Sequence, residues 1–156
     1  MASWSEIEVE APELAALARH YFDMNAHKVL ATLRRDGSPR VSGTEVRFSG
    51  GELWLGSMPG ARKARDLQRD PRFALHGGPA DPGAGWDGDA KLAGRAEEIA
   101  DAERRAAVLG EQHRESHLFR ADVSELSVVR LGGDPPDHLV IEAWHAGRGV
   151  SRRERR

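Results

Sequence analysis

Apolar residues recur along this chain of 156 residues with two different spacings. Near the N-terminus, Leu14, Leu17, Tyr21 and Met24 follow one another at helical spacing, and Pro12 suits the first turn of a helix. The spacing predicts an amphipathic helix over residues 12–24. A second helix is predicted over residues 101–113, "DAERRAAVLGEQH".

Alternating apolar residues predict short antiparallel strands between these helices. "HKVLATLR" carries Val29, Ala31 and Leu33 on one face, and the turn signal "RDGSP" leads into "RVSGTEVRF", which is typical of a hairpin. After the turn "SGG", "ELWLGS" is predicted as the third strand of a meander. "RFAL" and "AKLAGRAEEI" are predicted as further strands.

The C-terminal third has the same strand character. Residues 118–131 predict one long strand with a bend near Ser124, and "HLVIEAWH" predicts a final strand. Residues 76–89, rich in Gly, Pro and Asp, predict a long loop, and residues 148–156 predict a frayed, Arg-rich tail. Six or seven short strands with two or three helices favour a mainly β fold, a small antiparallel barrel in one domain over residues 1–147.

Composition narrows the class of protein. Because the chain has no cysteine, it has no disulfide, thiolate metal site or cysteine nucleophile, which fits a cytoplasmic protein. Its formal charge of −2 argues against a general nucleic-acid-binding function. The apolar runs are too short to span a membrane, and we expect no membrane association.

The segment "PGARKARDLQRDPR" at residues 59–72 predicts a Gly-led turn followed by a short basic helix. Lys63 lies at the boundary between the apolar stripe and the solvated face. With free N–H groups at Ala61 and Arg62 it is compatible with a phosphate site, because an anion there meets the helix dipole and two cations. A solvated basic helix explains the same residues equally well, and the spacing is not that of a P-loop.

The strand "RVSGTEV" has no apolar face. One side carries Arg40, Ser42 and Thr44, and the other carries Val41, Gly43 and Glu45. Glycine within a strand marks close approach of a ligand or another chain to the backbone, and the neighbouring hydroxyls supply hydrogen bonds. An edge strand facing water is the alternative interpretation.

Other candidate groups are weaker. His113 and His117 have a spacing that can bind a metal, but no acidic third ligand accompanies them, and surface histidines are the better interpretation. Asp87 and Asp89 lack the remaining residues of a calcium loop. The sequence therefore predicts no metal site and no catalytic side chain.

The order of four motifs carries a resemblance. "VLATLRRDGSPRVSGTEV", "ELWLGS", "ARKARDLQRDPRFAL" and "AKLAGRAEEI" together resemble the pyridoxamine 5′-phosphate oxidase-like flavoproteins and their deazaflavin-dependent relatives, over residues 27–99. The resemblance implies a six- to seven-stranded antiparallel split β-barrel of the FMN-binding type. It also implies a homodimer with cofactor sites at the interface.

The resemblance assigns roles to particular residues. The strand after the hairpin would lie along the flavin, Ser57 would contact the ribityl and phosphate groups, and the Arg-Lys pair at the helix start would bind the phosphate. Trp144, on the last strand, would reach the cofactor of the partner subunit. The implied cofactor-binding residues are Arg40, Val41, Ser42, Gly43, Thr44, Glu45, Ser57, Arg62, Lys63 and Trp144.

The implied activity is hydride transfer between FMN and a small organic substrate. A deazaflavin-dependent reductase, or a flavin- or haem-binding protein without turnover, is the alternative. "WHAGRGVSRRERR" departs from the C-terminal segment of the vitamin B6 oxidases, so oxidation of pyridoxine is not expected.

Overall fold

A single antiparallel sheet dominates the computed structural model, which describes residues 1–78 and 86–156. Nine strands form it within these residues: β1 (Lys28–Leu33), β2 (Pro39–Thr44), β3 (Val46–Ser49), β4 (Glu52–Ser57), β5 (Arg72–His76), β6 (Gly88–Glu98), β7 (His117–Gly132), β8 (His138–His145) and β9 (Gly149–Arg155). The helices are α1 (Trp4–Glu10), α2 (Pro12–Asp23), α3 (Arg62–Arg69) and α4 (Ala102–Leu109), and a 3-10 turn, η2 (Glu111–His113), follows α4. The mainly β prediction is confirmed, with more strands than expected.

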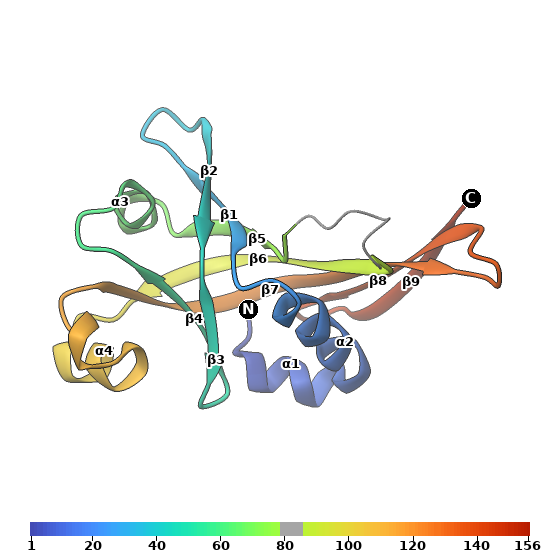
Figure 1. Ribbon diagram of the computed structural model, residues 1–156, viewed down its shortest axis with the longest axis horizontal. Coiled ribbons are helices and arrows are strands. Elements are labelled where there is room, and N and C mark those ends of the chain that lie inside the picture. Colours follow the sequence, from blue (N-terminus) through green and yellow to red (C-terminus); the bar gives the residue numbers. More distant parts are fainter. Residues whose placement is uncertain (79–85) are drawn as a thin grey trace.

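The strands are arranged in the order β2-β1-β5-β6-β7-β4-β3, and β8 and β9 extend the sheet from β7 (Figure 1). The expected meander is divided at Glu45, because β2 pairs with β1 whereas β3 pairs with β4. The sheet does not close, and the two halves are joined through the long strands β6 and β7. This arrangement fits the split barrel.

The bend expected near Ser124 is a β-bulge. Ala93 pairs with Glu125 and Gly94 pairs with Val123, which leaves Ser124 as the extra residue. Its hydroxyl donates a hydrogen bond to the carbonyl of Ala93 at 3.1 Å. Glycine is required at position 94, since a Cβ atom there would lie 2.1 Å from the carbonyl oxygen of Asp122.

Helices α1 and α2 lie together beside the sheet, below β7 and β8 in Figure 1. The predicted helix over residues 12–24 is confirmed as α2, and a capping box between Ser3 and Glu6 starts α1. Trp4, Ile7 and Phe22 are buried in the core against the sheet. No helix in the described ranges is both long and apolar enough to cross a membrane.

The buried face of β1 differs from the prediction. Lys28, Leu30 and Thr32 are buried, whereas the alternate face with Val29 and Ala31 is only half-buried. The two polar residues are accommodated because each has partners. The Lys28 ammonium group donates to the carbonyls of residues 25 and 26, and Thr32 donates to a carboxylate on α3.

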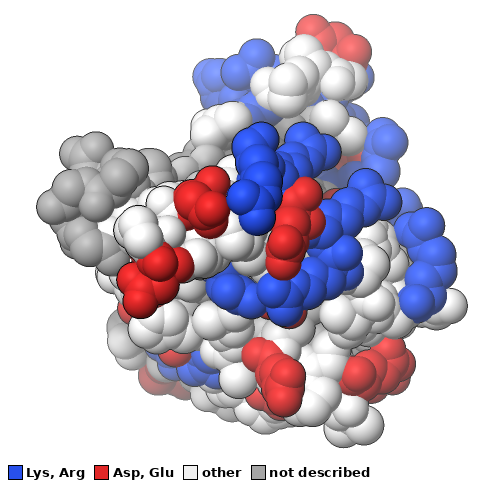
Figure 2. All heavy atoms as spheres, turned by 90° about the vertical axis from the view of Figure 1, so that its right-hand side faces the viewer, with Lys and Arg blue, Asp and Glu red and all other residues white. Residues whose placement is uncertain are grey.

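Residues 148–156 are not a frayed tail, because Gly149–Arg155 forms β9 and pairs along β8. Every residue of β9 is exposed, so main-chain hydrogen bonds hold the strand rather than an apolar face. Basic and acidic side chains are interspersed at this end of the molecule (Figure 2), with Arg152 paired to Glu154 at 3.2 Å.

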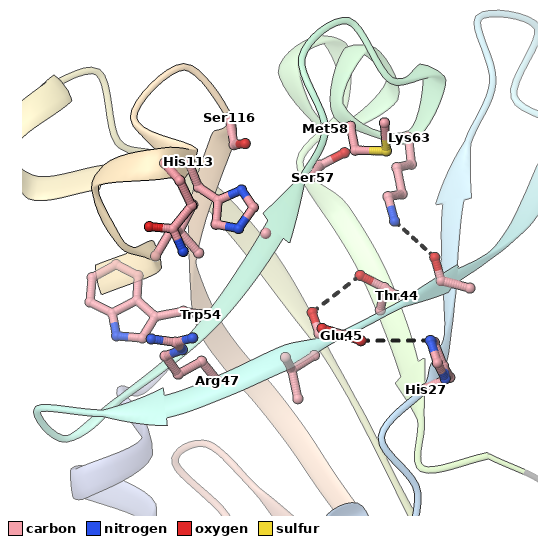
Figure 3. A pocket seen from close by; sticks show the side chains of 15 residues that line it. His27, Thr44, Glu45, Arg47, Trp54, Ser57, Met58, Lys63, His113 and Ser116 are labelled. Carbon is pink, nitrogen blue, oxygen red and sulfur yellow. Dashed lines mark hydrogen bonds and ion pairs between the residues drawn. The ribbon is translucent and has the colours of Figure 1, made fainter. Parts of the chain in front are cut away.

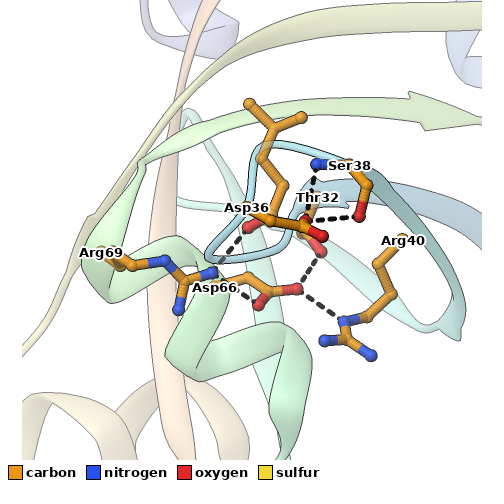
Figure 4. Close-up of polar contacts among 7 residues, drawn as sticks. Thr32, Asp36, Ser38, Arg40, Asp66 and Arg69 are labelled. Carbon is orange, nitrogen blue, oxygen red and sulfur yellow. Dashed lines mark hydrogen bonds and ion pairs between the residues drawn. The ribbon is translucent and has the colours of Figure 1, made fainter.

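A buried carboxylate holds α3 against the sheet. Asp66 is 3% exposed and accepts hydrogen bonds from Thr32 Oγ1 at 2.8 Å, Arg40 Nε at 2.6 Å and Arg69 Nη2 at 2.9 Å (Figure 4). Burial opposes ionisation of Asp66, but these three hydrogen bonds outweigh it and lower the pKa of the carboxyl below its usual value. The helix is thereby tied to β1 and β2 at one point.

We expect Asp66→Asn to lower the free energy of unfolding at pH 7 by about 2–4 kcal/mol, because it leaves two guanidinium groups without their carboxylate. The ion pairs contribute fully above the unfolded-state pKa of 3.8 and are lost as the pH falls through the lower, folded-state pKa. The difference between variant and wild type should therefore shrink in acid, as measured by urea unfolding across pH. Asp70→Asn, at a pair with Arg72 that is more exposed than the Asp66 pairs, is the control and should lose much less stability. Equal losses in both variants would contradict the role of Asp66.

Candidate functional site

A cavity of about 520 Å³ lies between two walls of different origin (Figure 3). One wall is formed by β2, β3, β4 and the start of α3, and includes Ser57 and Lys63. The other comes from the end of α4 and the turn that follows it, and includes Leu109 and His113. We call this space the Lys63 cavity.

The α4 wall is tied to the sheet at the bottom of the cavity. Arg47 Nη1 on β3 donates to the carbonyl of Val108 at 2.6 Å, and the guanidinium of Arg104 lies 5.5 Å from the ring centroid of Trp54. Arg47 and Trp54 themselves line the cavity. These contacts connect the two walls of the cavity.

Half of the residues predicted to bind a cofactor line this cavity. Gly43, Thr44, Glu45, Ser57 and Lys63 do so. They come from the end of β2, the residue after it, the end of β4 and the first turn of α3. Residues up to 20 positions apart in the sequence are thus brought to one space.

The other predicted residues lie elsewhere. Val41 is 70% exposed and Ser42 is half-buried on β2, outside the cavity. Arg40 and Arg62 line a second hollow of about 460 Å³ near the β1–β2 hairpin. We call this second space the arginine hollow; it is lined by Arg34, Arg35, Asp36, Arg40, Arg62, Arg65, Asp66 and Arg69.

Trp144 does not reach outward. Its side chain is fully buried in the core, and its Nε1 donates to Glu10 Oε2 at 2.9 Å within the same chain. The indole therefore packs α1 against β8, and we remove Trp144 from the candidate site. The sequence could not show this, because Glu10 lies 134 residues away.

Lys63 is a cation partly withdrawn from water without a counter-ion. Its Nζ donates to the carbonyl of Gly43 at 2.8 Å, and no carboxylate in the described residues forms an ion pair with it. Burial lowers the pKa of Lys63, because the charged form loses hydration that no opposite charge replaces. A bound anion would supply that missing charge.

Ser57 offers an unused hydroxyl to the same space. Its Oγ is buried and has no hydrogen-bond partner in the part of the chain that the structure describes. Buried polar atoms are almost always paired, so an orphan at a cavity wall indicates a position where a ligand or water completes the hydrogen bond. Figure 3 shows Ser57 beside Lys63 on one side of the cavity.

Gly43 gives the cavity wall a bare strip of backbone. A Cβ atom at this position would meet nothing within 4 Å, and the backbone conformation is one that any residue adopts. The fold therefore does not require glycine here. The lack of a side chain leaves room beside β2 for a flat group to approach the main chain.

His117 holds the turn before α3, a role that the sequence did not indicate. The Gly60 N–H donates to His117 Nε2 at 3.1 Å, so the ring proton lies on Nδ1, which donates to Glu98 Oε1 at 2.7 Å. The N–H of Ala61 donates to the carbonyl of Met58. We expected this N–H group to be free, and the structure shows that it is not. His113 and His117 belong to no metal-ligating cluster among the described residues.

Comparison with known proteins adds a family to this geometry. Residues 24–142 match the sequence model of a family described as pyridoxamine 5′-phosphate oxidase. The match covers the sheet from the end of α2 into β8 and includes every residue named above that lines the Lys63 cavity. No curated protein matches the chain by sequence.

Solved structures share the fold at low sequence identity. PhzG from Burkholderia lata 383, in complex with tetrahydrophenazine-1-carboxylic acid, superposes with a TM-score of 0.70 at 11% identity, covering 96% of both chains. A putative pyridoxamine 5′-phosphate oxidase from Listeria innocua has a TM-score of 0.60 at 15% identity, covering 73% of this chain and 96% of that one. A putative 5-nitroimidazole antibiotic resistance protein from Bacteroides thetaiotaomicron has a TM-score of 0.58 at 14% identity, covering 72% and 81%.

The orphaned hydroxyl gives a prediction about the free protein. Ser57→Ala should leave the free energy of unfolding unchanged or raise it by about 1 kcal/mol, because it removes a buried polar atom that makes no hydrogen bond. Thr32→Val is the matched control and should lower it by about 1–2 kcal/mol, since Thr32 donates to Asp66. Urea unfolding measures both. A clear loss of stability in Ser57→Ala would show that the hydroxyl is already bonded in the free protein.

Proposed function

The chain belongs to the pyridoxamine 5′-phosphate oxidase family, and we propose that it is an FMN-binding oxidoreductase acting on a small organic substrate. The observation that carries the proposal is that Lys63 and Ser57 lie on the same wall of the cavity. A partly buried cation and a buried hydroxyl lie together on one cavity wall, and among the described residues the first has no counter-ion and the second no hydrogen-bond partner. One anionic group bearing several acceptor oxygens would satisfy both.

The phosphate of FMN fits this part of the cavity. Phosphate oxygens accept hydrogen bonds from an ammonium group and a hydroxyl together, and such charge-assisted bonds are strong. On binding, Lys63 would exchange or share its present bond to the Gly43 carbonyl, which is the neutral acceptor that it uses in the free protein. Ser57 would gain a first hydrogen bond without giving one up.

The flavin ring fits the wall formed by the end of β2. Gly43 exposes the main chain to the cavity, and Thr44 and Glu45 continue that wall. When bound, the flavin supplies hydride transfer. The protein's own part is then to orient the ring against β2, to anchor its phosphate, and to limit water with Met58 and Leu109, which line the same space.

We also propose that a second copy of the chain completes the site. Met58 lines the cavity but is 78% exposed, and Val41 is 70% exposed on the same face of β2 as Gly43. Single exposed apolar side chains are common on protein surfaces, but two of them close to a binding cavity suit burial at an interface. The homodimer implied by the family resemblance would cover them.

Removal of the Lys63 charge should weaken FMN binding. We expect Lys63→Ala to lose about 1–3 kcal/mol of binding free energy, the range for a charge-assisted hydrogen bond, in fluorescence titrations with FMN. Lys91→Ala, at an exposed lysine on β6 outside the cavity, is the control and should bind FMN as the wild type does. An unchanged dissociation constant in Lys63→Ala would place the phosphate elsewhere.

Gly43→Val tests the position of the flavin ring, again by fluorescence titration with FMN. A Cβ atom at this position meets no protein atom within 4 Å, and valine suits a strand, so the free energy of unfolding should be retained while FMN binding is lost. The visible spectrum of the purified protein identifies the cofactor, because flavin, deazaflavin and haem absorb differently. A folded protein that is colourless and binds none of the three would overturn the proposed function.

The proposed dimer can be tested by measuring the mass of the protein in solution. The chain has a mass of 17.1 kDa, and sedimentation equilibrium should give twice that value at micromolar concentration. Val41→Asp should shift the protein towards the monomer, because it buries an unpaired carboxylate at the interface. FMN binding should weaken in parallel. A wild-type protein that sediments as a monomer with FMN bound would contradict the shared site.

A further inference from the structure

His117 lies at the base of the turn that separates Ser57 from Lys63 in the sequence. It begins β7, and in the pairing of β4 with β7 it lies directly across from Ser57. Its Nε2 accepts a hydrogen bond from the N–H of Gly60, the residue at the middle of the turn, at 3.1 Å. The bond therefore acts on the segment that sets the spacing between the two side chains proposed to bind the phosphate of FMN.

A chain of hydrogen bonds continues from His117 to the far end of α3. Its Nδ1 donates to Glu98 Oε1 at 2.7 Å, and the two oxygens of Glu98 accept from Gln68 Nε2 at 3.1 and 2.9 Å. Gln68 belongs to the last turn of α3, so these bonds connect both ends of the helix to His117. The imidazole is 21% exposed and stacks on Phe119, with 6.3 Å between the ring centroids. Its orientation and its tautomer are thereby fixed.

The bond from Gly60 requires the neutral form of His117. Because Nδ1 already carries the proton that is donated to Glu98, a second proton binds at Nε2. Protonated Nε2 is a donor, and it then faces the N–H of Gly60, which is a donor as well. The hydrogen bond is replaced by a repulsive contact, which the turn relieves by moving away from the ring. Histidine is the side chain that ordinarily takes up this proton between about pH 8 and pH 5.

Charged groups around His117 act on how readily it is protonated, but not on this change from acceptor to donor. The carboxylate of Glu98 favours the imidazolium form, because opposite charges attract. Arg65 of α3 opposes it from the side of the turn, where its Nη2 lies 4.0 Å from the position of a Cβ atom on Gly60. The neighbouring turn η2 carries a second titratable ring, His113.

We propose that His117 is a positioning residue for the cofactor phosphate, and that protonation of its Nε2 loosens the turn, so that the protein binds FMN at neutral pH and releases it in mild acid. The inference rests on the proposed function, because it takes Ser57 and Lys63 as the residues that bind the phosphate. Binding groups need to be held within about 0.5 Å of their productive positions, and a shifted turn no longer holds these two.

Fluorescence titrations with FMN from about pH 8 to about pH 5 test the proposal. We expect the wild type to bind FMN about tenfold or more weakly at the acid end. His117→Gln keeps an acceptor for the Gly60 N–H and takes up no proton, so its affinity at neutral pH should be retained. In acid it should fall only as far as protonation of the FMN phosphate itself, near about pH 6, requires. His117→Phe has no acceptor and should bind FMN weakly at every pH.

His20→Gln is the matched control, because His20 is an exposed histidine on α2 outside the Lys63 cavity. This variant should keep the pH dependence of the wild type. An equal loss of affinity in acid for the wild type and His117→Gln would overturn the role of His117 and leave the proposed function intact. Tighter FMN binding by the wild type in acid would show that the protonated ring itself binds the phosphate, and would overturn the proposed release.

A measurement on the free protein separates this inference from the proposed function. The NMR resonance of the Gly60 amide should move with pH in the wild type, with the same midpoint as the ring resonances of His117. It should stay constant in His117→Gln. A Gly60 resonance that does not follow the His117 ring would overturn the coupling, whether or not FMN binds. Absence of FMN binding at every pH, with the Gly60 resonance following His117, would instead overturn the proposed function and the release of FMN that rests on it.

Discussion

The buried carboxylate of Asp66 fixes the position of α3, and the candidate site depends on that position. It joins Thr32 on β1 to Arg40 on β2 and to Arg69 on the helix itself. The helix is held near its middle, and from its first turn Lys63 donates a hydrogen bond to the carbonyl of Gly43 on β2. The same carboxylate prevents two of the arginines from repelling each other. A single buried charge thus organises an otherwise unbalanced group of cations.

Local patterns in the sequence predicted most of the elements, because strands and helices of this fold carry clear periodicity. The bend at Ser124 and the basic helix over α3 are examples. The buried face of β1 was missed, since the polarity of Thr32 is compensated by Asp66, 34 residues away. The strand β9 was missed as well, because it has no apolar face and is held by its main chain.

The candidate site was predictable where a residue violates a local rule, and not where its role depends on a distant partner. Gly43 within a strand and Lys63 beside an apolar stripe were visible in the sequence, and both line the cavity. Residues that depart from the best local choice are expected where function competes with stability. Local patterns could not predict the positions of Arg62, Trp144 and His117. Helix phase and long-range hydrogen bonds set the orientation of these side chains.

The hydrogen bond from Gly60 to His117 also sets the phase of α3. The turn from Met58 to Ala61 has a fixed length, and each residue along the helix rotates its side chain by about 100°. One additional residue in this turn would direct Arg62 toward the space that Lys63 now faces, and one residue fewer would place Ala64 there. The short turn thus decides that Lys63 faces the Lys63 cavity and that Arg62 faces the arginine hollow.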